Sequence, residues 1–279
     1  MEFWSLGLVF GVVVGFTLGL TGGGGSIFAV PLLIYGMGVD PREAVGASLA
    51  AVGATSFAGF LMRWRRGEVE IPVGLLFAAT GMAGAPIGAW LNSRLPPAAL
   101  LSGFAVLMTV VALRMWRKAR INPAETHALR ASLTPCAADD AGPVCKRDPQ
   151  GRLKITSRCG MLLSTLGFLT GILSGLFGVG GGFVIVPALV LFSGMGIHRA
   201  VATSLLVIAL IGASGVASYV WYDRPLNMTL ATLFATGGVL GMQLGAKASH
   251  RLSGPTLQRT FSIAMLMVAV FMLFRQLSG

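Results

Sequence analysis

The sequence has few charged side chains for its length, and this shortage decides its class. Only 11% of its 279 residues are charged, whereas 54% are hydrophobic. Soluble domains carry about 25% charged residues, and a soluble chain of this size could not bury so much apolar surface. The sequence therefore predicts an all-α, polytopic membrane protein whose apolar surface is covered by the lipid bilayer.

Acidic residues and histidines are missing from the middle of the apolar runs. The three histidines, His127, His198 and His250, lie at the edges of such runs or in a polar segment. An intramembrane enzyme would need clustered acids, histidines or a nucleophile with its base, and a proton relay would need buried ionisable groups. We therefore expect a protein that is not an enzyme, with no catalytic residues and no cofactor.

Cysteine is also scarce. Cys136 and Cys145 lie in a long polar segment, and Cys159 lies at the membrane end of that segment. A metal site would call for closer pairs such as C-x-x-C. We expect reduced thiols and no metal site.

The net charge of +11 does not indicate a nucleic-acid partner. About half of the 21 lysines and arginines fall between residues 114 and 158, and most of the others flank apolar runs. This is the pattern of a membrane protein rather than of a binding stripe for nucleic acid.

The apolar runs are of two kinds. A membrane-spanning helix needs about 20 apolar residues, and six runs near that length are predicted as ordinary spans: 44–62, 71–91, 98–113, 200–222, 226–246 and 256–274. Two others, Phe3 to Val39 and Gly160 to Ile197, are too long for one helix and contain a glycine cluster near the middle. Because glycine favours leaving the helical conformation, each is predicted as two half-helices around a break.

The two long runs belong to an internal repeat. GLTGGGGSIFAVPLLIYGMG at 19–38 aligns with GLFGVGGGFVIVPALVLFSG at 175–194, including Pro31 with Pro187 and, further on, Ser48 with Ser204. After a one-residue insertion the alignment continues through a second set of matched glycines, Gly81, Gly84, Gly88, Gly238, Gly241 and Gly245. Repeats of this kind predict two copies of one fold. We expect repeats at 1–117 and 159–279, joined by a polar cytoplasmic linker at 118–158.

Two topologies fit the repeat. If the glycine-broken segment crosses the membrane, each half has four spans and the repeats are parallel. If the segment enters and returns, each half has a re-entrant hairpin plus three spans, and the repeats are inverted. The distribution of lysine and arginine favours inversion, because it places Arg199, Lys247, Arg251 and Arg259 on the side of Arg63, Arg65 and Arg66.

The glycine breaks are the predicted substrate site. Irregular backbone at membrane depth is tolerated only where it is buried in protein or lines a cavity, and matched breaks in two repeats mark the centre of a transporter. Free backbone N–H groups and the positive end of the following half-helix can hold an anion there. The predicted site residues are Gly22, Gly23, Gly24, Gly25, Ser26, Ser48, Gly178, Gly180, Gly181, Gly182, Thr203 and Ser204.

Several nearby residues have more ordinary interpretations. Serine and threonine in membrane helices often bond to their own backbone, and the second glycine set is predicted to serve helix packing. Gln243, an amide inside a span, is expected to bond to another helix. Val179, opposite Gly23 in the repeat, indicates that the two breaks are not equivalent.

The paired motifs GLTGGGGSIFAVPLL and GLFGVGGGFVIVPAL, each followed by a helix with A-V-x-x-S-L, resemble the TauE/SafE family of sulfite and sulfonate permeases. The resemblance covers both halves and omits the linker. It implies a multi-pass carrier of the bacterial inner membrane that moves sulfite, sulfoacetate or other organosulfonates, often as an exporter.

Other functions remain open at this point. The same breaks could serve a channel, or a cation carrier that uses their carbonyl oxygens. The linker could also be the working part of a membrane anchor or sensor. The substrate, its direction, any coupling ion and the oligomeric state are left open, with a homodimer as one candidate.

Overall fold

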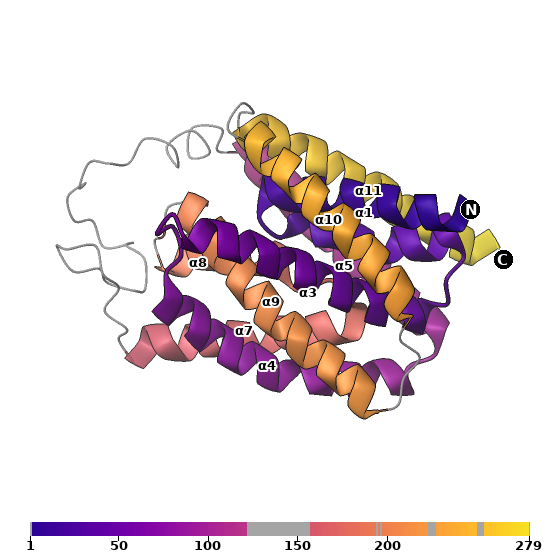
Figure 1. Ribbon diagram of the computed structural model, residues 1–279, viewed down its shortest axis with the longest axis horizontal. Helices are drawn as coiled ribbons and strands as arrows, with labels where there is room; N and C mark the ends of the chain where they lie inside the picture. Colours follow the sequence, from indigo (N-terminus) through magenta and orange to yellow (C-terminus); the bar gives the residue numbers. More distant parts are fainter. Residues whose placement is uncertain are drawn as a thin grey trace.

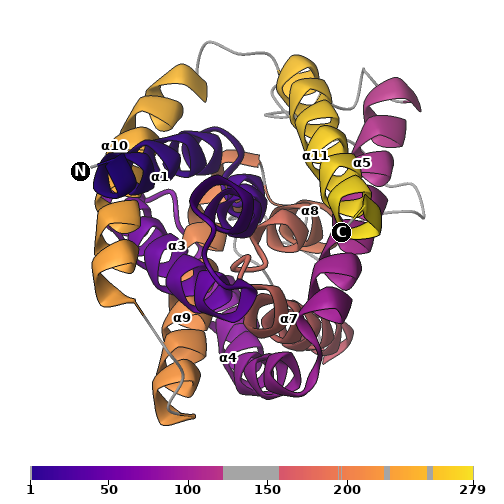
Figure 2. The same ribbon diagram turned by 90° about the vertical axis from the view of Figure 1, so that its right-hand side faces the viewer.

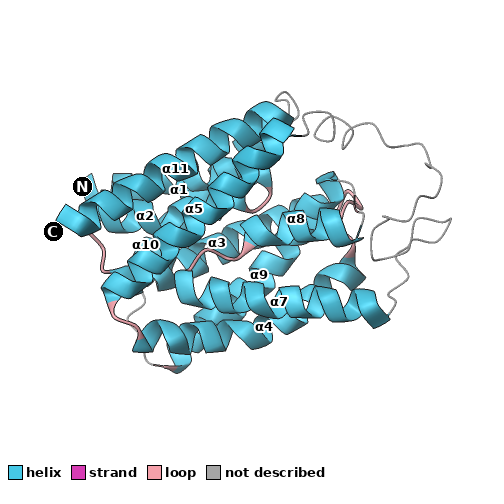
Figure 3. Ribbon diagram, turned by 180° about the vertical axis from the view of Figure 1, so that it is seen from behind, coloured by secondary structure: helices cyan, strands magenta, loops and turns pink. Residues whose placement is uncertain are grey.

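A computed structural model describes residues 2–121, 157–193, 195, 197–222, 227–249 and 254–278. The predicted linker at 118–158 lies almost wholly outside the described residues, as do Cys136 and Cys145. In the described part the chain forms helices and turns, without strands (Figure 3). Five helices are long and apolar enough to cross a membrane, which agrees with an all-α membrane protein.

The helices follow the predicted apolar runs. The first half contains α1 (Glu2–Thr21), η1 (Gly24–Phe28), α2 (Ala29–Pro31), η2 (Leu32–Gly36), α3 (Pro41–Trp64), α4 (Ile71–Arg94) and α5 (Pro97–Ile121). The second half contains α7 (Ser157–Phe177), α8 (Gly182–Ser193), α9 (Ile197–Trp221), α10 (Met228–Ser249) and α11 (Gly254–Ser278). All six predicted ordinary spans are therefore helices.

Local signals in the sequence explain where α3 begins. The carboxylate of Asp40 accepts a hydrogen bond from the backbone N–H of Arg42 at 2.9 Å, and Pro41 occupies the first helical position. An acidic N-cap satisfies one of the free amides of the first turn, and proline at that position loses no helical hydrogen bond. The helix therefore starts directly after the turn that ends the first broken segment.

The first broken segment folds back along α1. A Cβ on Gly25 would press on Thr17 and Leu18, a Cβ on Gly36 would press on the ring of Phe10, and a Cβ on Gly7 would lie 3.6 Å from the methyl group of Met37. Residues progressively later in the returning arm thus contact residues progressively earlier in α1, so the two arms are antiparallel. The returning arm is irregular, because a 3-10 turn, a short α-helical stretch and a π-helical turn succeed one another around Pro31.

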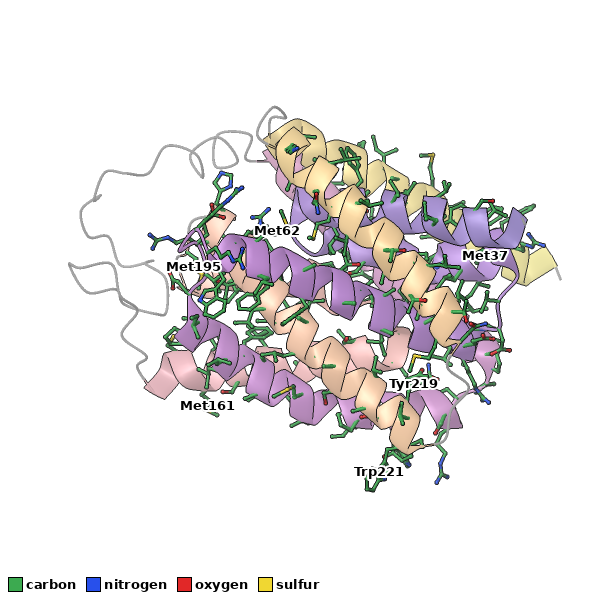
Figure 4. The ribbon with its side chains drawn as sticks, in the orientation of Figure 1. Met37, Met62, Met161, Met195, Tyr219 and Trp221 are labelled. Atoms are coloured by element: carbon green, nitrogen blue, oxygen red, sulfur yellow. The ribbon has the colours of Figure 1, made fainter. Side chains whose placement is uncertain are left out.

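The second broken segment also turns back at its glycines. Met161, near the start of α7, and Met195, just after α8, lie toward the same end of the molecule, where Met62 also lies (Figure 4). Met37 lies toward the opposite end, together with Tyr219 and Trp221 (Figure 4). The two broken segments therefore enter the molecule from opposite ends (Figure 1).

The helices of one half pack against those of the other. The pairs are α1 with α10, α4 with α7, α3 with α9, and α5 with α11 (Figures 1 and 2). Helices α3 and α9, which correspond in the repeat, run in opposite directions, because Gly53 lies beside Gly212 while Leu49 lies beside Gly215. The hydrophobic core runs through these interfaces and includes the largest buried side chains, among them Phe77, Phe104 and Phe234.

The second glycine set serves helix packing, as predicted. A Cβ on Gly84 or Gly88 would collide with carbonyl oxygens of α7, and one on Gly241 or Gly245 would collide with carbonyl oxygens of α1. Small residues at such spacing let membrane helices approach backbone to backbone. Helix pairs α4–α7 and α1–α10 are thus joined at van der Waals distance along most of their length.

Candidate functional site

The two glycine breaks meet at the centre of the molecule. A Cβ built on Gly23 would lie 2.7 Å from the Cα of Gly182, and a Cβ built on Gly182 would lie 2.5 Å from the Cα of Gly23. No side chain fits between two backbones this close. The structure therefore brings together two glycine clusters that lie far apart in the sequence. The residues of both clusters are buried.

The two breaks differ in backbone conformation, as the mismatch at Val179 predicts. In the first break Gly22 and Gly23 have φ of 75° and 156°, whereas in the second break Gly178, Gly180 and Gly181 have φ of 72°, 69° and 67°. Residues with side chains rarely adopt such angles, which explains why glycine occupies these positions. The chain reverses within a few residues in both breaks, but it does so by different routes.

Ser48 and Ser204 each contact the break of the opposite half. The hydroxyl of Ser48 lies 2.7 Å from the carbonyl oxygen of Gly178, and that of Ser204 lies 2.5 Å from the carbonyl oxygen of Gly22. Each hydroxyl also reaches a carbonyl of its own helix, Val45 or Val201. The matched serines are thus at the breaks, with their protons directed to carbonyl oxygens.

Asn92 is a third side chain that donates to this region, and the sequence analysis missed it. Its amide nitrogen donates to the carbonyl oxygen of Leu176 at 2.7 Å, and the side chain is only 2% exposed. Leu176 belongs to the last turn of α7, just before the second break. The available signal in the sequence was an amide side chain near the end of an apolar run. The residue that aligns with Asn92 in the second half is Ser249, which has no amide, so the repeat did not draw attention to this position.

The remaining predicted residues are distributed differently. Ser26 donates to the carbonyl of Gly23 at 2.8 Å, and the N–H of Gly25 donates to the hydroxyl of Thr21 at 3.2 Å, so both are bonded within their own break. Thr203 accepts the backbone N–H of Glu70 at 3.0 Å. The hydroxyl of Thr203 is thus directed to the connection before α4 rather than to either break.

Several backbone N–H groups at the breaks have no hydrogen-bond partner in the part of the chain that the structure describes. Gly22 and Gly178 continue the helices before them by donating to Leu18 and Ser174. Among the described residues, no hydrogen bond is formed by the N–H groups of Gly23, Val179, Gly180 and Gly181. Buried donors of this kind are uncommon, and the half-helix α8 starts directly after the last three. Val179 was absent from the predicted site because its side chain is apolar, although its backbone lies within the break.

The surroundings of the breaks are uncharged. The buried polar side chains of the described residues are serines and threonines together with the single amide of Asn92. The same part of the chain has no group of three or more histidine, cysteine, aspartate or glutamate side chains that could hold a metal ion. Backbone dipoles therefore dominate the local electrostatics.

Two expectations about individual residues are wrong. Gln243 is exposed on the outer face of α10 and forms no hydrogen bond in the described part of the chain, because its position faces away from the neighbouring helices. Cys159 is disulfide-bonded rather than reduced. The other two cysteines, Cys136 and Cys145, lie outside the described residues.

Comparison with known proteins gives one family across most of the chain. A family model described as "Sulfite exporter TauE/SafE" matches residues 7–272, which confirms the resemblance drawn from the glycine motifs. A Xylella fastidiosa Temecula1 protein named "Probable membrane transporter protein" is 34% identical over 268 residues, covering 95% of this chain and 93% of the relative. The "Probable membrane transporter protein YunE" of Bacillus subtilis strain 168 is 26% identical over 274 residues, covering 96% of each chain. No solved structure matches the chain.

Proposed function

Because the chain belongs to the sulfite exporter TauE/SafE family of membrane transporters, we propose that it exports small sulfur-containing anions across the inner membrane of a bacterial cell. Sulfite, sulfoacetate and other organosulfonates are the substrates to test. The family and the names of the relatives indicate a transporter rather than an enzyme. The anion is proposed to bind at Gly22 to Ser26 and Gly178 to Gly182.

The observation that carries this proposal is an imbalance between donors and acceptors at the breaks. The carbonyl oxygens of Gly22, Leu176 and Gly178 already accept hydrogen bonds from Ser204, Asn92 and Ser48. The N–H groups of Gly23 and of Val179 to Gly181 are unused. Side-chain donors thus cover the negative ends of α1 and α7, while the positive ends of the returning half-helices stay available. The balance favours an anion.

The same imbalance argues against a cation carrier at this site. A cation would need free carbonyl oxygens, and those of Gly22, Leu176 and Gly178 are already engaged by short hydrogen bonds of 2.5 to 2.7 Å. Binding a cation would require these hydroxyl and amide donors to turn away, at a cost of about 1 kcal/mol or more for each bond.

We further propose that the two halves are inverted repeats at 1–117 and 159–279, joined by a cytoplasmic linker at 118–158. The opposite directions of α3 and α9 support this arrangement. The ion pair between Arg199 and Glu70, at 3.6 Å, also supports it, because it puts Arg199 on the side of the basic turn that follows α3. An inside-negative potential favours anion efflux by about 2.3 kcal/mol per charge per 100 mV, so export needs no coupled ion.

The test is efflux from proteoliposomes loaded with sulfite or sulfoacetate, with chloride and sulfate as comparison anions. Gly24→Ala and Gly180→Ala are assayed beside the wild type, with Gly67→Ala as a matched control. Gly67 has the same φ of 69° as Gly180 but open space around its Cβ. Selective flux that persists in the control and falls about tenfold or more in both break variants supports the proposal. Folded protein that moves none of these anions would refute it.

A further inference from the structure

Six helices of the bundle are locked together by backbone contact. In the pair α1–α10 a Cβ on Gly15 would collide with the carbonyl oxygen of Gly238, and in the pair α4–α7 a Cβ on Gly175 would collide with that of Ala85. Helices α3 and α9 cross at Gly53 and Gly212. Since each glycine-joined pair takes one helix from each half, rocking of one half against the other would have to break these backbone contacts.

The helix pair α5–α11 is attached in another way. Helix α11 packs mainly along α5, and Figure 2 shows the pair at one side of the bundle, beside α8. Its contacts with the broken segments are made by side chains, namely Leu100 and Leu101 of α5 in the seam and two pairs of aromatic rings. The ring centroids of Phe104 and Phe177 are 5.5 Å apart, and those of Phe271 and Tyr35 are 5.4 Å apart. Ring contacts can separate and reform without disturbing any backbone.

A small apolar cavity lies in the seam between α5 and the broken segments. Its volume is about 10 Å³, and its lining includes Leu100 and Phe104 of α5, Val45 of α3, and Phe177. Such a volume holds about one water-sized sphere, so the seam is closed in this structure.

The cavity adjoins the second break. Phe177 directly precedes Gly178, and the Cα and carbonyl oxygen of Val45 lie 2.8 Å from the position of a Cβ on Gly178. A path that widens this cavity would therefore reach Gly178, at the start of the second break. Leu49, one turn further along α3, is not among the lining residues of the cavity and contacts Gly212 and Gly215 of α9.

We propose that this seam is the access route to the second break, that the α5–α11 pair is the part that moves, and that Phe104 and Phe177 close the route. The identity of the anion that uses the route rests on the function proposed above. The route itself can be tested without any substrate. Closed aromatic rings exclude a hydrated anion, whereas separation of α5 from Phe177 would admit one.

The first test is cysteine accessibility in liposomes. Val45→Cys and Leu49→Cys are treated with a water-soluble anionic methanethiosulfonate, and modification at each position is followed by mass spectrometry. Val45 is 4% exposed and Leu49 0%, so both are closed in this structure. Because Leu49 can react only through rare opening of the locked core, we expect position 45 to react about tenfold faster or more. Equal rates, or no reaction at position 45, would overturn the proposed route.

The second test locks the seam. In the double variant Phe104→Cys/Phe177→Cys, the two thiols are cross-linked by a short bifunctional thiosulfonate. Sulfite efflux is measured before cross-linking, after cross-linking and after reduction of the cross-link. The matched control is Phe60→Cys with Trp64→Cys, whose rings stack at 5.6 Å within α3 alone. We expect linking to abolish efflux reversibly in the first pair only. Efflux that survives complete linking would reject the moving pair. Absence of efflux from the wild-type protein would instead refute the proposed function, while the labelling rates still decide the route.

Discussion

Gly23 and Gly182 touch backbone to backbone, although they belong to different halves of the chain. Their contact joins the two breaks into one proposed anion site, which lies at the end of both incoming helices and at the start of both returning ones. Such a site has no room for a charged side chain and no need of one, because it is lined by backbone dipoles. Substitutions in the breaks should therefore act on binding geometry rather than on charge.

The first prediction separates backbone strain from crowding at the breaks. An alanine at φ of 69° costs roughly 1–2 kcal/mol in strain, and this cost is shared by Gly180→Ala and Gly67→Ala. Only at Gly180 does the new methyl group also meet Ile208, at 2.9 Å. We expect Gly67→Ala to retain sulfite efflux. Gly180→Ala should lower the rate of sulfite efflux about tenfold, which is equivalent to about 1.4 kcal/mol. Equal efflux from the two folded variants would contradict the crowded site.

The second prediction concerns the serines that reach across to the opposite break. Ser48→Ala and Ser204→Ala leave the carbonyl oxygens of Gly178 and Gly22 without these donors. A buried acceptor without a partner costs about 1–3 kcal/mol, and its exposed dipole repels an anion. Both variants should melt at lower temperature and bind sulfite more weakly, which is measured by thermal shift with and without sulfite.

The control for the serine variants is Ser102→Ala. Ser102 donates only to carbonyls of its own helix, Ala98 and Ala99, so its loss should change neither melting nor the sulfite shift. If the sulfite-induced shift in melting temperature is unchanged in Ser48→Ala and Ser204→Ala, the carbonyl groups of Gly178 and Gly22 do not affect sulfite binding.

The third prediction assigns Asn92 to the support of the second break. Asn92→Ala leaves the Leu176 carbonyl exposed in the core at the negative end of α7. We expect a lower melting temperature and slower efflux. Gln243→Ala, which removes an amide that faces outward from α10, should have neither effect. Similar behaviour of the two amide variants would show that burial and the bond to Leu176 have no functional consequence.

The sequence predicted the helices, the breaks and the use of Gly84 and Gly241 in packing, because each depends on local composition or on a match between halves. It did not predict the role of Asn92, since a bond to Leu176 depends on how α4 lies along α7. Thr203 was included because it is adjacent to Ser204, yet a step of one residue on a helix turns the side chain by about 100°. That turn directs Thr203 to Glu70.

The donor–acceptor balance could not have been predicted from the sequence either. The repeat placed Ser48 and Ser204 near the breaks, and both were predicted to be substrate-site residues. A hydroxyl has a single proton, and in the structure both acceptors within reach of each hydroxyl are carbonyl oxygens, one in the opposite break and one in its own helix. Only the three-dimensional arrangement shows that these serines act on the polarity of the site.

The fourth prediction tests whether backbone contact locks the bundle. Gly7 and Gly15 lie on the same face of α1 and against the same partner, α10, but they differ in the space around them. A Cβ on Gly7 meets only side-chain atoms, at 3.6 Å or more, whereas one on Gly15 collides with the Gly238 carbonyl. Alanine is favoured over glycine in a helix by about 1 kcal/mol, so Gly7→Ala should raise the melting temperature in detergent. Gly15→Ala should lower it, because α1 and α10 must separate to admit the methyl group. Two variants of equal stability would mean that α1 can shift along α10 at little cost, and the interlocked core would then be free to move during transport.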